Sequence, residues 1–337
     1  MLKDSFERTL DYLRVSITDR CNLRCIYCMP REGVEWKPHE NILTFEQIIR
    51  IINIFSTLGV KKIRVTGGEP LLRRGVSLFL KELKSISGIE SVSLTTNGIL
   101  LNAYLDEAES AGNAALPDSI NISLDSLSFE KYKTITRCKN TDVTSAPDRS
   151  ILPAIDRLIK KNITVKINCV PVRGVNEDEI LPLASLAKDK NISVRFIELM
   201  PAGPASGLQF IPGGETARLI EKAYGSLTAL NRMSGNGPAI YYSLKGFTGR
   251  IGFINAVSRG FCDKCNRLRL TSEGYLKLCL SHGTGIDLRK LISAGCSDID
   301  IADAVTKAVY GKPRSHTLSD IYSEPEIHRE GLSKIGG

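Results

Sequence analysis

The stretch Tyr12–Cys28, YLRVSITDRCNLRCIYC, places three cysteines directly after a run that is predicted to be a short β-strand, Tyr12–Ile17. Cys21, Cys25 and Cys28 are separated by three and two residues. Their thiols should therefore converge on a loop at the carboxyl end of that strand.

Three soft thiolate ligands this close together suit a zinc ion or an iron–sulfur cluster, and reduced thiols without metal are the remaining alternative. A structural zinc site needs four closed ligands, and the nearest histidine, His39, lies eleven residues beyond Cys28. On a four-iron cluster, three thiolates would leave one iron open, as a catalytic cofactor site requires. The spacing therefore favours a cluster over zinc.

Short strand-like runs alternate with longer amphipathic stretches from this strand to about Leu199. The predicted strands are Tyr12–Ile17, Lys62–Thr66, Ser91–Thr95, Ser119–Leu124, Thr164–Val170 and Ser193–Ile197. The predicted helices are Thr44–Leu58, Val76–Ser85, Leu101–Ser110, Leu152–Lys160 and Asp178–Lys188. Thr44 and Gln47 form a capping-box start for the first helix, and the polar stretch Lys139–Ser150 is predicted to be a loop. This order predicts an α/β fold, a partial (β/α)6 barrel of the TIM type, with functional residues at the carboxyl ends of the strands.

The character of the sequence changes after Met200. The segments PAGPASG and IPGG are rich in proline and glycine, and strand-like pieces follow at Ala239–Leu244 and Arg250–Ile254. We therefore predict a partial barrel over residues 1–200 and a C-terminal α+β extension over residues 201–337.

Charge and composition limit the classes of partner. The net charge of +8 suits a nucleic acid and a small polyanion equally well, but the basic clusters, such as Arg73-Arg74, are short and scattered. No apolar run is long enough to span a membrane, and the first ten residues, MLKDSFERTL, are not an apolar leader. We therefore expect a cytoplasmic protein with no membrane and no nucleic-acid partner. Its nine cysteines are then expected to be reduced or metal-bound rather than paired in disulfides.

A second group of cysteines lies in the C-terminal region, at Cys262, Cys265 and Cys279. The stretch 268–280 is predicted to be a hairpin that turns at residues 272–274 and returns Cys279 to Cys265. The three thiols can thus meet around one cofactor, and a zinc ribbon completed by His282 is the alternative.

Arg267 and Arg269 alternate with leucines on this hairpin, so both guanidinium groups project from one face of a strand. Beside an open cluster they would suit an anionic, ring-bearing substrate, whereas a solvated strand face is the alternative.

Several of these motifs resemble those of one known family. The spacing of the first cysteines, with Tyr27 among them, resembles the signature of the radical S-adenosylmethionine (SAM) superfamily, and Thr66-Gly67-Gly68-Glu69-Pro70 resembles its methionine-binding motif. Paired glycines let the backbone approach a ligand closely. Together with LRVSITDRC, RFIELMP, KPRSH and the terminal GLSKIGG, the second cysteine block is similar to the GTP 3′,8-cyclases of molybdenum-cofactor biosynthesis. This resemblance extends from Leu13 to Gly337.

The resemblance implies a lyase with two [4Fe-4S] clusters and SAM, which converts GTP to 3′,8-cyclo-7,8-dihydro-GTP. In the family, a 5′-deoxyadenosyl radical abstracts H3′ of GTP and the C3′ radical adds to C8. Cysteines 21, 25 and 28 would hold the SAM-binding cluster, and cysteines 262, 265 and 279 the GTP-binding one. The implied SAM contacts are Tyr27, Gly68, Ser123 and Met200. The implied GTP contacts are Arg14, Arg64, Thr95, Lys166, Arg267 and Arg269, each with a structural ion pair as the alternative. Catalytic roles are implied for Arg14, Arg267, Arg269, Gly336 and Gly337.

The family also implies partners: GTP as substrate, a flavodoxin or ferredoxin-type electron donor, and a downstream cyclic pyranopterin monophosphate synthase. A homodimer is one assembly that the family allows. Another radical SAM enzyme with an auxiliary cluster, such as a peptide-modifying maturase, is the nearest alternative. A zinc-stabilised nucleic-acid-binding protein is the alternative from a different class. Arg267, Arg269 and the Gly-Gly end favour the nucleotide enzyme.

Overall fold

The computed structural model describes residues 1–138, 146–201, 203–230 and 237–316. Its strands form a 12-stranded sheet in the order β12-β11-β10-β1-β2-β3-β4-β5-β6-β9-β8-β7. The strand bounds are β1 Tyr12–Ser16, β2 Lys62–Thr66, β3 Ser91–Thr96, β4 Ser119–Ser123, β5 Thr164–Cys169, β6 Ser193–Ile197, β7 Thr228–Ala229, β8 Ile240–Ser243, β9 Arg250–Ile254, β10 Arg267–Leu270, β11 Tyr275–Lys277 and β12 Gly285–Asp287.

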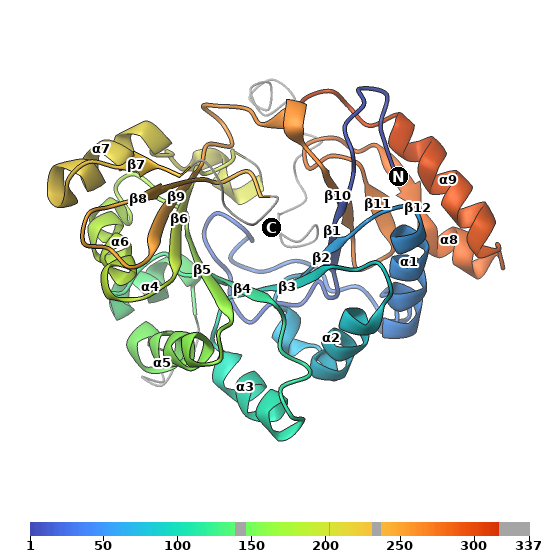
Figure 1. Ribbon diagram of the computed structural model, residues 1–337, viewed down its shortest axis with the longest axis horizontal. Coiled ribbons are helices and arrows are strands. Elements are labelled where there is room, and N and C mark those ends of the chain that lie inside the picture. Colours follow the sequence, from blue (N-terminus) through green and yellow to red (C-terminus); the bar gives the residue numbers. More distant parts are fainter. Residues whose placement is uncertain (139–145, 202, 231–236, 317–337) are drawn as a thin grey trace.

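Helices cover the outer side of this sheet, and Figure 1 shows the strands as an open arc with the helices outside it. The helix bounds are α1 Phe45–Thr57, α2 Val76–Ser85, α3 Leu101–Ser110, α4 Phe129–Thr136, α5 Pro147–Lys160, α6 Ile180–Asp189, α7 Gly213–Tyr224, α8 Leu288–Ser293 and α9 Asp298–Tyr310. Strands β1 to β6 run parallel to their neighbours. The predicted α/β fold, a partial barrel of the TIM type, is confirmed.

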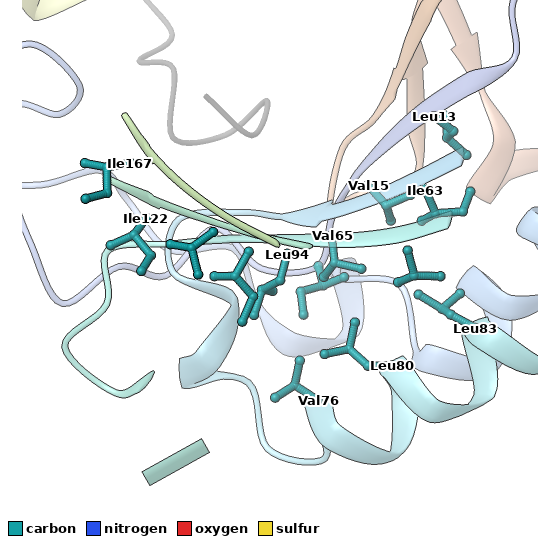
Figure 2. Close-up of a cluster of buried hydrophobic side chains, with 14 of the residues drawn as sticks. Leu13, Val15, Ile63, Val65, Val76, Leu80, Leu83, Leu94, Ile122 and Ile167 are labelled. Carbon is teal, nitrogen blue, oxygen red and sulfur yellow. The ribbon is translucent and has the colours of Figure 1, made fainter. Parts of the chain in front are cut away.

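Alternation along the strands separates the core from the inside of the arc. Outward-facing residues such as Leu13, Ile63 and Leu94 are fully buried in one hydrophobic core. Figure 2 shows the α2 residues Val76, Leu80 and Leu83 beneath these strands. Each fully buried side chain of this size contributes roughly 1.5–3 kcal/mol. The alternate positions face inward, where several are basic, because successive strand residues point to opposite faces.

The first helix begins as its sequence predicts. Thr44 accepts a hydrogen bond from the Gln47 amide at 3.2 Å, and Gln47 Oε1 accepts one from the Thr44 amide at 2.9 Å. The capping box is thus confirmed, and Ile48, Ile52 and Phe55 bury the helix against the sheet.

Two helical regions of the barrel differ from the sequence prediction, and the C-terminal helices α7, α8 and α9 were not predicted either. Helix α4 was not predicted, and α5 begins at Pro147 rather than Leu152. The predicted loop is therefore wrong for residues 147–150, while residues 139–145 lie outside the described part of the chain. Proline suits the first turn of a helix because its missing N–H has no intrahelical acceptor there.

The C-terminal region extends both edges of the barrel sheet. Strand β10 pairs in parallel with β1, and β9 pairs in parallel with β6. The predicted hairpin is present as the antiparallel pair β10–β11. The division between residues 200 and 201 stays a prediction. Across the described ranges, no helix is long and apolar enough to cross a membrane.

Candidate functional site

A cavity of about 310 Å³ lies inside the arc, and residues from many strands line it. Its walls include all six grouped cysteines and nearly all of the predicted ligand contacts: Cys21, Cys25, Cys28, Cys262, Cys265, Cys279, Tyr27, Gly68, Ser123, Met200, Arg14, Arg64, Thr95, Arg267 and Arg269. Residues far apart in sequence thus border one space. Lys166 is not part of this lining, and Gly336 and Gly337 lie outside the described residues.

The first cysteine set lies on the loop after β1. The Cys28 amide donates to the Cys25 carbonyl at 2.9 Å, which makes a tight turn between two of the thiols. The amides of Arg24 and Ile26 donate to carbonyls of α4 at 2.8 and 2.9 Å. The unpredicted helix α4 therefore fixes the backbone of the loop that carries this set.

Buried acids surround these thiols. Burial raises the pKa of Cys25 well above its ordinary value, and Cys28, Asp125 and Cys21 add to the rise. Asp125 accepts a hydrogen bond from the Tyr27 hydroxyl at 2.5 Å and one from the Val170 amide at 2.8 Å. Burial raises the pKa of Asp125 to about 6 despite these two donors.

The Gly67-Gly68 turn packs directly against the approach to Cys21. The Gly68 amide donates to the Thr18 carbonyl at 2.8 Å, and a Cβ on Gly68 would lie 2.3 Å from the Arg20 carbonyl oxygen. Only glycine fits there, because real Cβ atoms do not approach a backbone oxygen that closely.

Glu69 follows this turn and is completely buried. Its carboxylate accepts hydrogen bonds from Thr96 Oγ1 at 2.8 Å and from the amides of Asn97 and Leu71 at 2.6 and 3.0 Å. Burial raises the pKa of Glu69 to about 7, against the effect of these donors. The first end of the cavity is thus built around two buried carboxyl groups.

The second cysteine set borders the cavity from the segment before β10 and the segment after β11. The Cys265 amide donates to the Cys262 carbonyl at 3.0 Å, and the His316 amide donates to Cys262 Sγ at 3.4 Å. Burial raises the pKa of Cys262. Burial also acts to raise the pKa of Cys265, but Arg267 and Lys312 outweigh it and lower that pKa.

A row of arginines crosses the sheet beside this second set. The register aligns Arg269 of β10 with Arg14 of β1, and Arg14 with Arg64 of β2. Burial, then Arg269 and Arg64, lower the pKa of Arg14 well below its ordinary value, and burial and Arg267 lower that of Arg269 to about 10. Like charges held this close and this deep are costly unless an anion offsets them. The second end is therefore suited to an anionic ligand.

Two basic residues on the far strands complete this charge distribution. Arg195 of β6, which belongs to no sequence motif, lines the cavity and donates to Asn121 Oδ1 at 2.6 Å. The alternation Val194-Arg195-Phe196 was the available signal, because it points one charge inward. Burial, then Arg195 and Arg64, lower the pKa of Lys166 to about 8. Lys166 is thus close enough to both arginines for their charges to repel its own.

The donor chemistry at both ends fits iron–sulfur clusters. Each end offers three thiols that influence one another electrostatically, and clusters are held by cysteine thiolates. His282, the alternative fourth ligand, contacts the Ser315 carbonyl through Nε2 at 3.0 Å. In the ranges that the structure describes, no group of three His, Cys, Asp or Glu side chains is arranged to hold a single metal ion.

Comparisons with known proteins agree with this arrangement. Residues 15–187 match the radical SAM superfamily, and residues 192–318 match the family described as Molybdenum Cofactor Synthesis C. The chain is 39% identical to a GTP 3′,8-cyclase of Clostridium perfringens and 41% identical to one of Moorella thermoacetica, with 100% of both chains covered in each case. In fold it is similar to the crystal structure of Streptococcus suis SuiB bound to the precursor peptide SuiA, with a TM-score of 0.56 at 16% identity, over 97% of this chain and 71% of that one.

Proposed function

Since this chain belongs to the GTP 3′,8-cyclase family of radical SAM enzymes, we propose that it converts GTP to 3′,8-cyclo-7,8-dihydro-GTP in molybdenum-cofactor biosynthesis. One observation carries the proposal. A single cavity is bordered by one cysteine set among buried acids and by a second set among buried arginines. SAM carries a positive sulfonium and GTP a negative triphosphate, so each end opposes the charge of the ligand proposed for it.

We propose that Cys21, Cys25 and Cys28 hold the cluster that binds SAM. When bound, the cluster and SAM supply a radical that can remove hydrogen from an unactivated carbon. The role of the chain is to orient SAM, through the Gly68 backbone and through three further contacts proposed on family grounds: Tyr27, Ser123 and Met200. Buried Asp125 fixes the Tyr27 hydroxyl through their hydrogen bond, so this contact is rigid before SAM arrives.

We propose that GTP lies against the row of arginines, with its base toward Cys262, Cys265 and Cys279. The proposed contacts are Arg14, Arg64, Thr95, Lys166, Arg267 and Arg269, to which we add Arg195. Guanidinium groups bind phosphate oxygens through paired, directed N–H donors. Cations on several strands can therefore hold the triphosphate in one orientation, and position is what the protein contributes to the reaction. The proposed catalytic part of Arg14, Arg267 and Arg269 is to fix the nucleotide against the radical source.

The test is an anaerobic reaction of the reconstituted protein with dithionite, SAM and GTP, followed by mass spectrometry of 5′-deoxyadenosine and the cyclised nucleotide. Both products together are the expected result. Deoxyadenosine without cyclised GTP would retain the radical class and move the substrate elsewhere, for instance to a peptide as in the maturase alternative. Neither product from protein with full iron and sulfide content would contradict the enzyme assignment.

The terminal residues Gly336 and Gly337 are proposed to enter the active site, on family grounds alone. Residues without side chains can pass a narrow opening where larger ones would clash. Gly336→Ala should therefore retain both clusters and lose cyclisation, measured as iron content beside product formation. Unchanged cyclisation in this variant would refute the role of the tail.

Membership of the family also supports partners that the residues themselves do not define. We propose a flavodoxin or ferredoxin-type donor for the electron, a downstream cyclic pyranopterin monophosphate synthase that consumes the product, a homodimeric assembly and a cytoplasmic location. Replacement of dithionite by each reduced donor protein in the same reaction tests the first of these.

A further inference from the structure

Residues 2–10, here called the N-terminal hairpin, fold back on themselves ahead of β1. Lys3 pairs with Thr9 in an antiparallel bridge, and the Leu10 amide donates to the Leu2 carbonyl at 2.9 Å. The Leu2 amide donates to Leu58 after α1 at 2.8 Å, and the Ser5 amide to Tyr310 at the end of α9 at 3.2 Å. The hairpin is therefore a fixed part of the fold.

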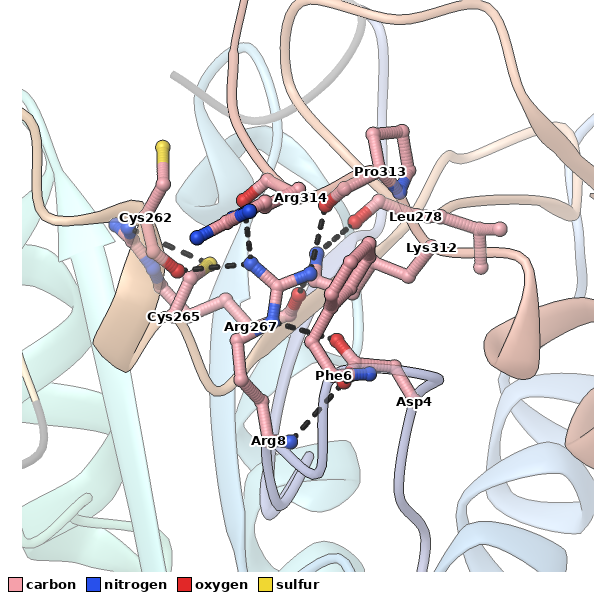
Figure 3. Close-up of polar contacts among 10 residues, drawn as sticks. All are labelled: Asp4, Phe6, Arg8, Cys262, Cys265, Arg267, Leu278, Lys312, Pro313 and Arg314. Atoms are coloured by element: carbon pink, nitrogen blue, oxygen red, sulfur yellow. Dashed lines mark hydrogen bonds and ion pairs between the residues drawn. The ribbon is translucent and has the colours of Figure 1, made fainter.

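Arg8 projects from this hairpin into the protein and contacts three separate segments. Its Nε donates to Asp4 Oδ2 at 2.6 Å, and the two side chains are 7% and 0% exposed. Its Nη1 donates to the carbonyls of Cys262 and Arg314 at 2.8 and 2.7 Å, and its Nη2 to that of Pro313 at 2.6 Å. Figure 3 shows the Arg8 guanidinium between Asp4 of the hairpin, Cys262, and Pro313 and Arg314.

The segment 312–316 in turn contacts Cys262 at one end and residues close in sequence to Cys265 and Cys279 at the other. Lys312 donates through Nζ to the Arg267 carbonyl at 3.1 Å and to the Leu278 carbonyl. At the other end, the His316 amide donates to Cys262 Sγ at 3.4 Å. Arg8 thus holds the middle of a segment that contacts Cys262 at one end and the neighbours of Cys265 and Cys279 at the other, and it also holds the backbone of Cys262 itself.

We propose that Arg8 is a positioning residue for the second cysteine set, acting through the carbonyls of Cys262, Pro313 and Arg314. The inference rests on the proposed function, in which this set holds a cluster. A buried ion pair is a poor source of stability, because removing two charges from water costs about as much as their attraction returns. The planar fork of directed donors is instead suited to fixing three carbonyls and a carboxylate in one rigid arrangement, which the single flexible ammonium of a lysine does less well.

The experiment uses the full chain with Cys21, Cys25 and Cys28 replaced by serine, so that only the second set can hold iron. In this background, Arg8→Gln, Arg8→Lys and the double variant Asp4→Asn with Arg8→Gln are compared. The double variant leaves no unpaired carboxylate buried. The matched control is Arg50→Gln. Arg50 also donates to a carboxylate, that of Asp298, at 2.7 Å and to a carbonyl, that of Cys296, at 2.8 Å, but it does not line the cavity.

The first readout is the rate at which 2,2′-bipyridyl removes iron from the reconstituted proteins, together with the electron paramagnetic resonance spectrum of the reduced cluster. Residues that orient metal ligands typically change metal affinity by about 10–100-fold. We expect iron loss about tenfold faster in Arg8→Gln and in the double variant, a smaller increase in Arg8→Lys, and parent behaviour in Arg50→Gln. The second readout, with all nine cysteines present, is the number of deoxyadenosines formed per cyclised nucleotide, which should rise in the Arg8 variants alone.

Thermal unfolding separates positioning from general stability. The positioning role is refuted if the rate of iron loss follows the unfolding midpoint in all variants, Arg50→Gln included. It is also refuted if Arg8→Gln matches the parent in both the rate of iron loss and the electron paramagnetic resonance spectrum. If the triple-serine parent takes up no iron and sulfide, the proposed second cluster fails and the inference falls with it. Faster iron loss with an altered spectrum at an unchanged midpoint supports the proposal.

Discussion

The two cysteine sets offer the same three ligands to one cavity, yet buried carboxyl groups adjoin the first set and buried basic side chains adjoin the second. Around the first set, the buried carboxyls of Glu69 and Asp125 raise the thiol pKa values further. Beside the second set, Arg267 and Lys312 lower the pKa of Cys265. Identical ligands can therefore serve a cationic cofactor at one end and an anionic substrate at the other, and the neighbouring residues make the difference.

The two sets also differ in how the chain holds them. The first lies within eight residues on one loop, fixed by α4 and the Gly67-Gly68 turn. The second is spread over a hairpin and fixed by residues from both ends of the chain, Arg8 and Lys312. The first set is thus a local motif, whereas the second is formed only when distant segments meet.

The largest expected effect separates the two sets by product. Cys28→Ser should abolish both deoxyadenosine and cyclised nucleotide, because the first set is proposed to start the chemistry. Cys279→Ser should abolish cyclised nucleotide and retain deoxyadenosine. Mass spectrometry of both products in parallel is the measurement, and a loss of deoxyadenosine in Cys279→Ser equal to that in Cys28→Ser would remove the distinction.

A smaller effect concerns the charge of the second end. Arg269→Gln should weaken GTP binding by about 10–100-fold, the size of a lost hydrogen bond to a charged group, and leave SAM binding unchanged. Calorimetric titration with each ligand measures this, and Arg157→Gln, an exposed pair with Asp106, is the control. Equal weakening for SAM would contradict the assignment.

The reciprocal change belongs to the first end. Gly68→Ala places a Cβ 2.3 Å from the Arg20 carbonyl oxygen, and overpacking of this kind costs typically about 1–3 kcal/mol. SAM binding should weaken and GTP binding should not. Gly207→Ala, where a Cβ would have no neighbour within 4 Å, is the matched control for the titration. If Gly68→Ala binds SAM with the affinity of the parent, the proposed contact between SAM and the Gly68 backbone is refuted.

The smallest effect is a dependence on pH at the second end. The pKa of Lys166 is lowered to about 8, chiefly by burial, so the nucleotide-free enzyme loses this charge as pH rises through 8. Triphosphate binding favours the protonated form, and GTP affinity should fall by up to about tenfold per pH unit above pH 8. Lys166→Arg should remove the slope, and SAM affinity should show none. A GTP affinity that does not change between pH 7 and 9.5 would contradict the proposed contact between Lys166 and GTP.

The sequence predicted the six barrel strands and most of their helices because burial imposes a clear period on each. It missed α4, whose residues FEKYKTIT form only a narrow apolar face. It placed the start of α5 five residues too late, at Leu152, because the stretch before Leu152 is polar and Pro153 lies inside the helix. These are short-range patterns that tertiary packing overrides.

The site residues that belong to a sequence motif could be predicted. The grouped cysteines and the Gly-Gly turn carry their chemistry in their spacing, and they border one cavity. Arg195 was missed because a single arginine in a strand has no motif, and Arg8 because its contact with the Cys262 carbonyl joins residues 254 positions apart. Contacts of that kind follow from the fold and not from any local pattern.

The pairing of β1 with β10 has a consequence for synthesis on the ribosome. Asp11 and Asn266, which are hydrogen-bonded beside this pairing, are 255 positions apart. At about 5–20 residues per second, the first strand waits for roughly 10–50 s with one edge unpaired. An unpaired edge is a template for association with other nascent chains. Translation speed and chaperone occupancy over that interval should therefore govern how much of this protein is recovered in soluble form.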